Sequence, residues 1–192
     1  MSAEPPGGAG TNAHTDPIGP FPPGEDPTEY DRLRRRVLWR FPSGLYLLGS
    51  RHLERRNLMT CSFVTQLCIS PKIVGVGVEQ SALTNELIHA SRSFCLSLVA
   101  REDRALVRRF VKPAVHDGTL STLNERPYVD SRVTGAPILH GAVAYVDCRV
   151  SHEIDLGSHT LFAGEVVDAG VGEGGEEREV LRMEDTRMSY GG

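Results

Sequence analysis

The sequence has no long apolar run and no surplus of positive charge. None of its hydrophobic stretches approaches the roughly 18 residues that a membrane helix requires, which argues against an integral membrane protein. Its net charge is −4 and its isoelectric point about 6.0, whereas domains that bind nucleic acid usually carry a basic surplus. The composition therefore predicts a chain that neither crosses a membrane nor binds nucleic acid.

The sequence also has no C-x-x-C pair of cysteines and no signal-peptide pattern. Four cysteines are present, and no two of them form a C-x-x-C pair: Cys61, Cys68, Cys95 and Cys148. The N-terminus has neither the basic nor the apolar region of a signal peptide. We therefore expect reduced thiols in a cytoplasmic protein, and no metal site.

Residues 1–27 have almost no large apolar side chains. This stretch holds seven prolines and five glycines, and only Ile18 and Phe21 are sizeable apolar groups. Such a segment cannot bury enough surface to offset the entropy lost on ordering. We expect a disordered Pro/Gly-rich segment over 1–27 and one folded domain over 28–192.

Alternation with a period of two dominates the folded part. A helix is expected from Thr28, with a Thr28/Asp31 capping pair, to a point before Pro42. Alternation then predicts strands over five ranges: 57–69, 73–79, 94–99, 141–153 and 158–168, the last two joined by a hairpin at 155–158. Short helices are expected over 83–90 and around 106–111, an irregular loop over 112–136, and a last short strand after the acidic loop 170–177. Such a pattern is typical of a mainly β, closed or partly closed antiparallel barrel with short peripheral helices.

The first polar motif is Asn57-Leu58-Met59-Thr60-Cys61-Ser62. In an extended strand, the hydroxyls of Thr60 and Ser62 lie on the face opposite to Met59 and Cys61. Such a face can offer hydrogen bonds to a planar polar ligand. The alternative is a half-exposed strand whose hydroxyls face water.

The second motif, Gln80 to Leu87, is the end of a strand that leads into a helix. Ser81 and Thr84 would lie near the free N–H groups of the first turn, where a phosphate binds favourably. The alternative is an ordinary helix cap. Neither G-x-G-x-x-G nor a P-loop is present, so Rossmann-type and P-loop nucleotide binding are not supported.

The third motif is Gly157 to Val166, with His159 at the start of a strand beside a tight turn. His159 shares a strand face with Leu161, Ala163 and Glu165. A single histidine in such a place suits either catalysis or a structural role. The other six histidines are scattered, and no metal-ligand spacing or Ser-His-Asp arrangement stands out.

Taken in order, these motifs resemble the flavin reductase family, which has the FMN-binding split-barrel fold. The resemblance spans about 41–192 and rests on five blocks: Asn57-x-Met59-Thr60-x-Ser62-Phe63, Ser70-Pro71, Ser81-x-x-Thr84-x-Glu86-Leu87-Ile88, Gly135-Ala136-Pro137-Ile138-Leu139 and Gly157 to Val166. The histidine block is the most specific of these. The fold it implies is a six-stranded antiparallel Greek-key split β-barrel with peripheral short helices, assembled as a homodimer.

The resemblance also implies a site and an activity. A flavin, FMN or FAD, would lie at the subunit boundary against Asn57, Met59, Thr60, Cys61 and Ser62, with its phosphate at Ser81 and Thr84. His159 would lie beside the ring, where the nicotinamide of NADH or NADPH enters. The protein would then transfer hydride from NAD(P)H to the flavin, and it could supply reduced flavin to a separate monooxygenase.

Some features depart from the family pattern. A charged hairpin, Arg51-His52-Leu53-Glu54-Arg55-Arg56, stands where many members have a glycine-rich one, and Cys61 stands where a small polar residue is common. Two alternatives therefore stay open. One is an FMN-binding split-barrel protein with another redox or sensing role, and the other is a non-enzymatic dimeric interaction module.

Overall fold

The computed structural model describes residues 16–186 and 188, and its internal contacts divide the chain after Phe41. The N-terminal unit contains helix α1 (Pro27–Leu38), which buries none of its residues. Asp26 caps this helix by accepting a hydrogen bond from the N–H of Glu29 at 2.9 Å, so the expected Thr28 cap is wrong. The second unit starts at residue 42, and the expected single folded domain over 28–192 stays a prediction. The expected disorder of residues 1–27 falls largely outside the described residues and stays a prediction.

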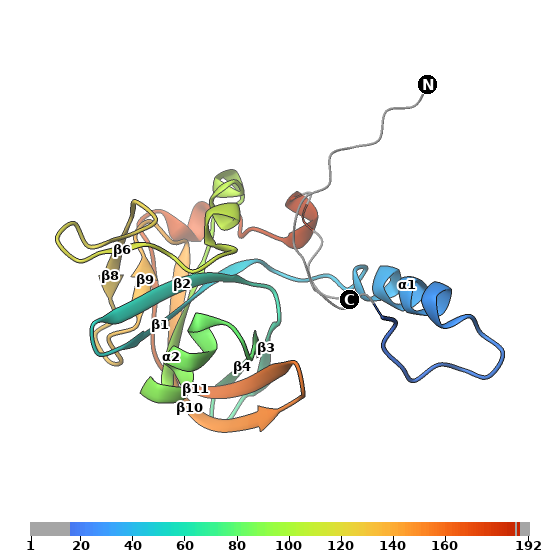
Figure 1. The fold of residues 1–192 in the computed structure, drawn as a ribbon. Helices are drawn as coiled ribbons and strands as arrows, with labels where there is room; N and C mark the ends of the chain where they lie inside the picture. Colours follow the sequence, from blue (N-terminus) through green and yellow to red (C-terminus); the bar gives the residue numbers. More distant parts are fainter. Residues whose placement is uncertain (1–15, 187, 189–192) are drawn as a thin grey trace. The chain divides into compact units, whose positions relative to one another are not determined.

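The β-rich unit, residues 42–189, is built on one antiparallel sheet of seven strands (Figure 1). In the order in which they pair, the strands are β2 (Arg55–Cys61), β1 (Tyr46–His52), β5 (Ser93–Leu98), β10 (Ala144–Asp155), β11 (His159–Val171), β4 (Ile73–Glu79) and β3 (Val64–Cys68). The mainly β fold is confirmed, with seven strands in this sheet instead of the six expected.

The two edge strands, β2 and β3, are neighbours in sequence. Only Ser62 and Phe63 separate them, although five other strands lie between them in the sheet. So short a link requires the sheet to curl until its edges meet. The N–H of Gly77 on β4 donates to the carbonyl oxygen of Phe63 at 2.9 Å, which holds the link against the opposite edge. The expectation of a single strand over 57–69 is therefore wrong, because the chain passes from one edge strand of the sheet to the other at 62–63.

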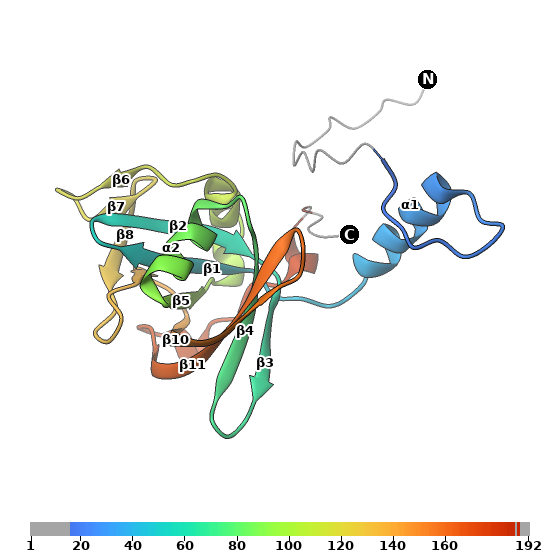
Figure 2. The ribbon, with the colours of Figure 1, turned by 60° about the horizontal axis from the view of Figure 1, so that its bottom comes forward.

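Two hairpins form the β10-β11-β4-β3 half of this sheet. Figure 2 shows β3 and β4 as a hairpin that projects beyond the rest of the sheet. The longest hairpin joins β10 and β11, and its turn lies between Asp155 and His159 as predicted. Strand β4 has the predicted bounds, 73–79.

A second, smaller sheet occupies the segment expected to be an irregular loop. It contains β6 (His116–Asp117), β7 (Thr122–Leu123), β8 (Arg126–Asp130) and β9 (Pro137–Leu139). Strands of two to five residues are too short to display an alternating pattern, which is why that expectation was wrong. The last strand expected after 170–177 is also wrong, because Val180 and Arg182 form isolated bridges only.

The helices cover both faces of the sheet. Helix α2 (Leu83–Ser91) packs against β1 and β2, and a 3₁₀ turn, η2 (Leu106–Phe110), packs against the same two strands (Figure 1). Further 3₁₀ turns are η1 (Arg101–Asp103), η3 (Gly175–Glu177) and η4 (Met183–Asp185). Leu47 and Leu48 of β1 belong to separate hydrophobic cores. Because β1 and β2 are buried on both faces, the hydroxyl-bearing face of β2 does not face solvent.

Candidate functional site

Asn57 and Thr84, predicted separately from two motifs, are in direct contact. The Asn57 side chain donates from Nδ2 to Oγ1 of Thr84 at 2.8 Å, and its Oδ1 accepts from the N–H of Ala114 at 2.8 Å. Asn57 is 2% exposed and Thr84 is fully buried. Both ends of the amide are therefore used inside the protein, and neither residue offers an accessible polar group in this structure.

Thr60 and Cys61 are also engaged within the protein. Thr60 donates its hydroxyl to the carbonyl oxygen of Val107 in η2 at 2.5 Å. Burial raises the pKa of the Cys61 thiol to about 12, so this residue stays a neutral thiol at physiological pH. Met59, which precedes them, is partly buried against the core that contains Cys61. Through their side chains, Thr60 and Cys61 hold the fold together.

Ser62 differs from these residues. It is 6% exposed, yet its hydroxyl has no hydrogen-bond partner among the described residues. A buried polar atom without a partner is unusual in a native protein and calls for a missing group. Ser62 lies in the two-residue link between β2 and β3, so this atom marks the place where the edges of the sheet meet.

The N-terminus of α2 has no side-chain cap. Ala82 occupies the cap position, and neither Ser81 nor Thr84 donates to or accepts from the first turn. Ser81 is exposed one residue before the cap. The N–H groups at the start of a helix are unpaired within the helix and favour an anion. The alternative reading of this motif, an ordinary Ser/Thr cap, is therefore wrong.

His159 opens β11 beside the end of β4, where it pairs in register with Glu79. Its ring is half-buried and tilted by 58° against the ring of Phe63, with 5.6 Å between centroids. Its Nδ1 shares a hydrogen bond with the hydroxyl of Ser158 at 2.9 Å. The other ring nitrogen, Nε2, makes no hydrogen bond within the described part of the chain.

The structure brings these groups to one end of the curled sheet. Phe63 links Ser62 to His159 through its ring, and Glu79, opposite His159, lies two residues before Ser81. The carbonyl of Ser158 accepts from the N–H of Gln80 at 2.9 Å, which fixes the turn before β11 to the loop before α2. We call Ser62, Ser81 and His159 the open residues, because each has a polar group without a partner among the described residues.

Gly75 and Gly77 are not part of a ligand cradle. A Cβ at Gly75 would meet the side chain of Leu67 at 2.7 Å, and one at Gly77 would meet Phe63 at 3.1 Å. The side chains of β3 and of the link before it thus fill the space that these glycines leave. The same packing positions Phe63 against His159, a contact that sequence reasoning missed.

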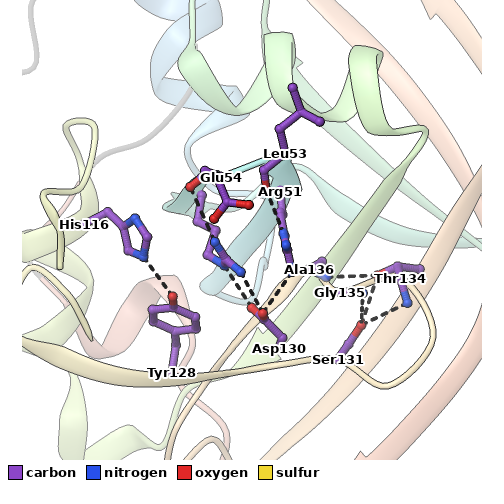
Figure 3. Close-up of polar contacts among 11 residues, drawn as sticks. Arg51, Leu53, Glu54, His116, Tyr128, Asp130, Ser131, Thr134, Gly135 and Ala136 are labelled. Carbon is purple, nitrogen blue, oxygen red and sulfur yellow. Dashed lines mark hydrogen bonds and ion pairs between the residues drawn. The ribbon is translucent and has the colours of Figure 1, made fainter. Parts of the chain in front are cut away.

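A second polar cluster lies at the charged hairpin between β1 and β2 (Figure 3). Arg56 donates from Nε and Nη2 to the two carboxylate oxygens of Asp130 at 3.0 and 2.8 Å, and Arg51 donates to Asp130 at 3.0 Å. Tyr128 and His116 share a 2.8 Å hydrogen bond beside it. Arg56, His116, Tyr128 and Asp130 border a hollow of about 410 Å³. Because both arginines bind the Asp130 carboxylate, the cluster fastens the hairpin to β8.

Within residues 16–186 and 188, no group of three or more His, Cys, Asp or Glu residues is arranged to hold a metal ion. No helix of that part is both long and apolar enough to cross a membrane. The same residues contain four free cysteines and no disulfide.

Comparison with known proteins identifies the family. The model of the flavin reductase like domain matches residues 38–191, which is most of the chain. The chain belongs to the flavin reductase family. The sequence resemblance is thus confirmed, and the open residues lie inside the matched region.

Individual relatives agree with this assignment. The chain is 30% identical over 149 residues to an NADH-dependent FAD reductase of Streptomyces globisporus, covering 77% of this chain and 81% of that protein. It is 29% identical over 157 residues to the reductase component of a 4-nitrophenol 4-monooxygenase/4-nitrocatechol 2-monooxygenase of Rhodococcus opacus, covering 78% and 81%. The solved structure of a Streptomyces globisporus NADH:FAD oxidoreductase superposes with a TM-score of 0.69 at 28% identity, covering 84% of this chain and 93% of that one.

The residues of this chain fit a flavin. Ser62 has a buried hydroxyl to pair with a polar ring edge, and the uncapped start of α2 beside Ser81 suits a phosphate. The Phe63–His159 pair provides an aromatic surface with a polar tip. The fit rests on the open residues rather than on all eight residues that the sequence suggested.

Proposed function

We propose that this protein is an NAD(P)H:flavin oxidoreductase that transfers hydride from NADH or NADPH to FMN or FAD. The observation that carries the proposal is the meeting of three unpaired polar groups, those of Ser62, Ser81 and His159, at one end of the curled sheet. Family membership and the NADH-dependent FAD reductase among the relatives support the same reaction.

The proposed binding roles follow from which groups are free. Ser81 and the N–H groups of Leu83 and Thr84 bind the flavin phosphate, because the first turn of α2 is uncapped and the helix dipole favours an anion there. The Ser62 hydroxyl and the backbone of the β2 end meet the polar edge of the ring, with Met59 packing nearby. Thr60 and Cys61 act through their backbone and keep that strand in place.

His159 is proposed to act on the nicotinamide. The bound flavin supplies the hydride acceptor, and the protein holds the two rings in reacting geometry. Ser158 fixes one nitrogen of the His159 ring, so Nε2 is free to hydrogen-bond a substrate group or to stabilise negative charge that develops on the ring. Phe63 limits the tilt of the imidazole by packing against it.

A homodimer is proposed to complete the site. β3 is an edge strand, and Leu67 within it is 48% exposed, Phe63 before it 46% and Ile69 after it 79%. An exposed edge strand with apolar side chains favours pairing with a second chain. The open residues lie beside this edge, so a second copy seated there would cover the flavin. Sedimentation should then show twice 21.0 kDa.

A cytoplasmic location and a monooxygenase partner complete the proposal. Free thiols are typical of a reducing compartment. The Rhodococcus opacus relative is the reductase component of a monooxygenase, which supports a role in supplying reduced flavin to such an enzyme.

The decisive experiment is a turnover assay with both nicotinamides and both flavins. Oxidation of NADH or NADPH, followed by absorbance, should require added flavin and should be absent without protein. A protein that binds flavin but shows no turnover with either nicotinamide would contradict the reductase. A protein that binds no flavin would contradict the site itself and would favour an interaction module.

A further inference from the structure

The Asn57 side chain of β2 makes hydrogen bonds to both the start of α2 and the 111–115 segment. No other described side chain connects these three elements in this way. Its Nδ2 donates to Thr84, the second residue of α2, and its Oδ1 accepts from the N–H of Ala114. The residues concerned are far apart in sequence: Thr84 lies 27 positions after Asn57, and Ala114 lies 57 positions after Asn57. The contact is therefore a tertiary one, made where three elements meet.

The orientation of this amide is determined by its partners. A backbone N–H can only donate, so the atom facing Ala114 must be the oxygen, and the nitrogen must face Thr84. Thr84 Oγ1 thereby accepts. Since Asn57 is 2% exposed and Thr84 fully buried, neither side chain reaches the surface where a ligand would bind.

We propose that Asn57 is a positioning residue, which holds the first turn of α2 where its free N–H groups and Ser81 meet the flavin phosphate. The proposal rests on the proposed function, because it needs a flavin phosphate at this turn. Asn57 would not touch the flavin. It would set the place of the helix start from the β2 side, since the first turn has no side-chain cap of its own and is otherwise fixed by Asn85, which donates to the carbonyl of Val78 on β4 at 3.1 Å.

This role predicts different effects on the binding of the flavin phosphate and of the flavin ring. The anchored turn faces the phosphate end of the flavin, whereas Ser62 and His159 are assigned to the ring end. Riboflavin has the same ring and no phosphate. A change at Asn57 should therefore weaken binding of FMN and leave binding of riboflavin almost unchanged, whereas a residue that touches the ring would weaken both.

The test measures the dissociation constants of FMN and riboflavin by quenching of flavin fluorescence, on the full chain. For Asn57→Ala we expect about a tenfold loss for FMN and less than about a twofold change for riboflavin. Thr84→Val, which removes only the accepting hydroxyl, should give the same ratio, and Thr84→Ser should restore the wild-type ratio. The double variant should lose no more than Asn57→Ala alone, since Asn57 and Thr84 act on α2 through one shared hydrogen bond.

Asn124 provides the matched control. Its amide also makes two hydrogen bonds, accepting from the N–H of Val115 at 2.9 Å and donating to the carbonyl of Arg109 at 2.7 Å, but it does not contact α2. Because Asn124 has a φ of 48°, the control is Asn124→Gly, which removes the amide without backbone strain. It should leave the FMN-to-riboflavin ratio as in the wild type.

Each outcome decides the proposal. An equal loss for both flavins in Asn57→Ala, or no loss for either, would overturn it while leaving the flavin site intact. A changed ratio in Asn124→Gly would assign the effect to the 111–115 segment instead and would also overturn it. If Asn57→Ala fails to fold, the two Thr84 variants decide alone. A wild-type chain that binds neither flavin would overturn the proposed function as well.

Discussion

The polar residues of the candidate site fall into two groups, which we call the framework side and the open side. The framework residues, Asn57, Thr60 and Thr84, are buried and hydrogen-bonded to the chain's own groups. Ser62, Ser81 and His159 have groups that the chain leaves without partners. All six are polar residues drawn from the same motifs. Whether such a residue binds a ligand therefore depends on where its hydrogen bonds already go, and its identity alone does not decide it.

The largest expected effect tests the open side. In His159→Ala, flavin reduction by NAD(P)H should slow about ten- to a thousandfold, a barrier rise of about 1.4–4 kcal/mol, while flavin affinity stays near wild type. Stopped-flow absorbance measures the rate. His152→Ala is the matched control, because His152 also shares a hydrogen bond with the preceding serine but lies on an exposed part of β10. An unchanged rate in a folded, flavin-loaded His159→Ala protein would remove His159 from the mechanism.

The next effect tests the framework side. Thr60→Val keeps the shape of the side chain but leaves the carbonyl of Val107 without its donor. Leaving a buried acceptor unsatisfied should lower the free energy of unfolding by about 1–3 kcal/mol. Urea denaturation measures the loss, and Thr65→Val on the exposed strand β3 serves as the control. If both variants lose the same stability, the Thr60 contact is not what fixes η2 to the sheet.

The buried thiols of the framework side make the free energy of unfolding depend on pH. Burial raises the pKa of Cys61 and Cys148 from 9.0 to about 12, and raises that of Cys95 as well. The unfolded chain therefore loses these protons first, so stability is fully present well below pH 9 and falls as the pH rises through 9 toward 12. At pH 9 the expected loss is about 0.4 kcal/mol per thiol, or about 1 kcal/mol for the three.

Denaturation at pH 7 and pH 9 measures this loss, and Cys61→Ala should reduce it by removing one of the three thiols. A loss as large in Cys61→Ala as in the wild type would mean that Cys61 does not contribute. Stability that rises between pH 7 and pH 9 would contradict the sign of the effect.

The smallest effect on stability is expected at Ser62. Its hydroxyl has no partner to lose, so Ser62→Ala should change the free energy of unfolding by no more than about 0.5 kcal/mol. The same variant should weaken flavin binding, because the ring edge loses a hydrogen bond. Fluorescence quenching and urea denaturation on one preparation measure both. A stability loss as large as that of Thr60→Val would move Ser62 to the framework side.

Sequence reasoning found the parts of this protein that local patterns control. Strand β4 and the β10–β11 hairpin have clean alternation and a turn signal, and both lie where they were predicted. The motifs around Asn57, Ser81 and His159 also indicated the family. These features depend on neighbours within a few positions along the chain.

The rest depends on contacts between distant segments. Thr60 was expected on a ligand-facing surface, but η2 covers that face of β2, and nothing within the 57–62 motif reports a 3₁₀ turn 47 residues later. The Asn57–Thr84 contact likewise joins two motifs that looked independent. The missed Phe63–His159 contact follows from the strand order, which places β3 and β11 on the two sides of β4, where Gly77 leaves room for the Phe63 side chain.

The two-residue link between β2 and β3 has a consequence for how the chain folds. Because Ser62 and Phe63 join strands at opposite edges, the link reaches its final place only after the strands between those edges have paired. Closing the sheet and assembling the open residues are then one event, late in folding and rich in contacts between distant segments. A partly folded chain would possess α2 and most strands and still have no place for a flavin. The quenching of flavin fluorescence would therefore report the final closure of the barrel rather than its early secondary structure.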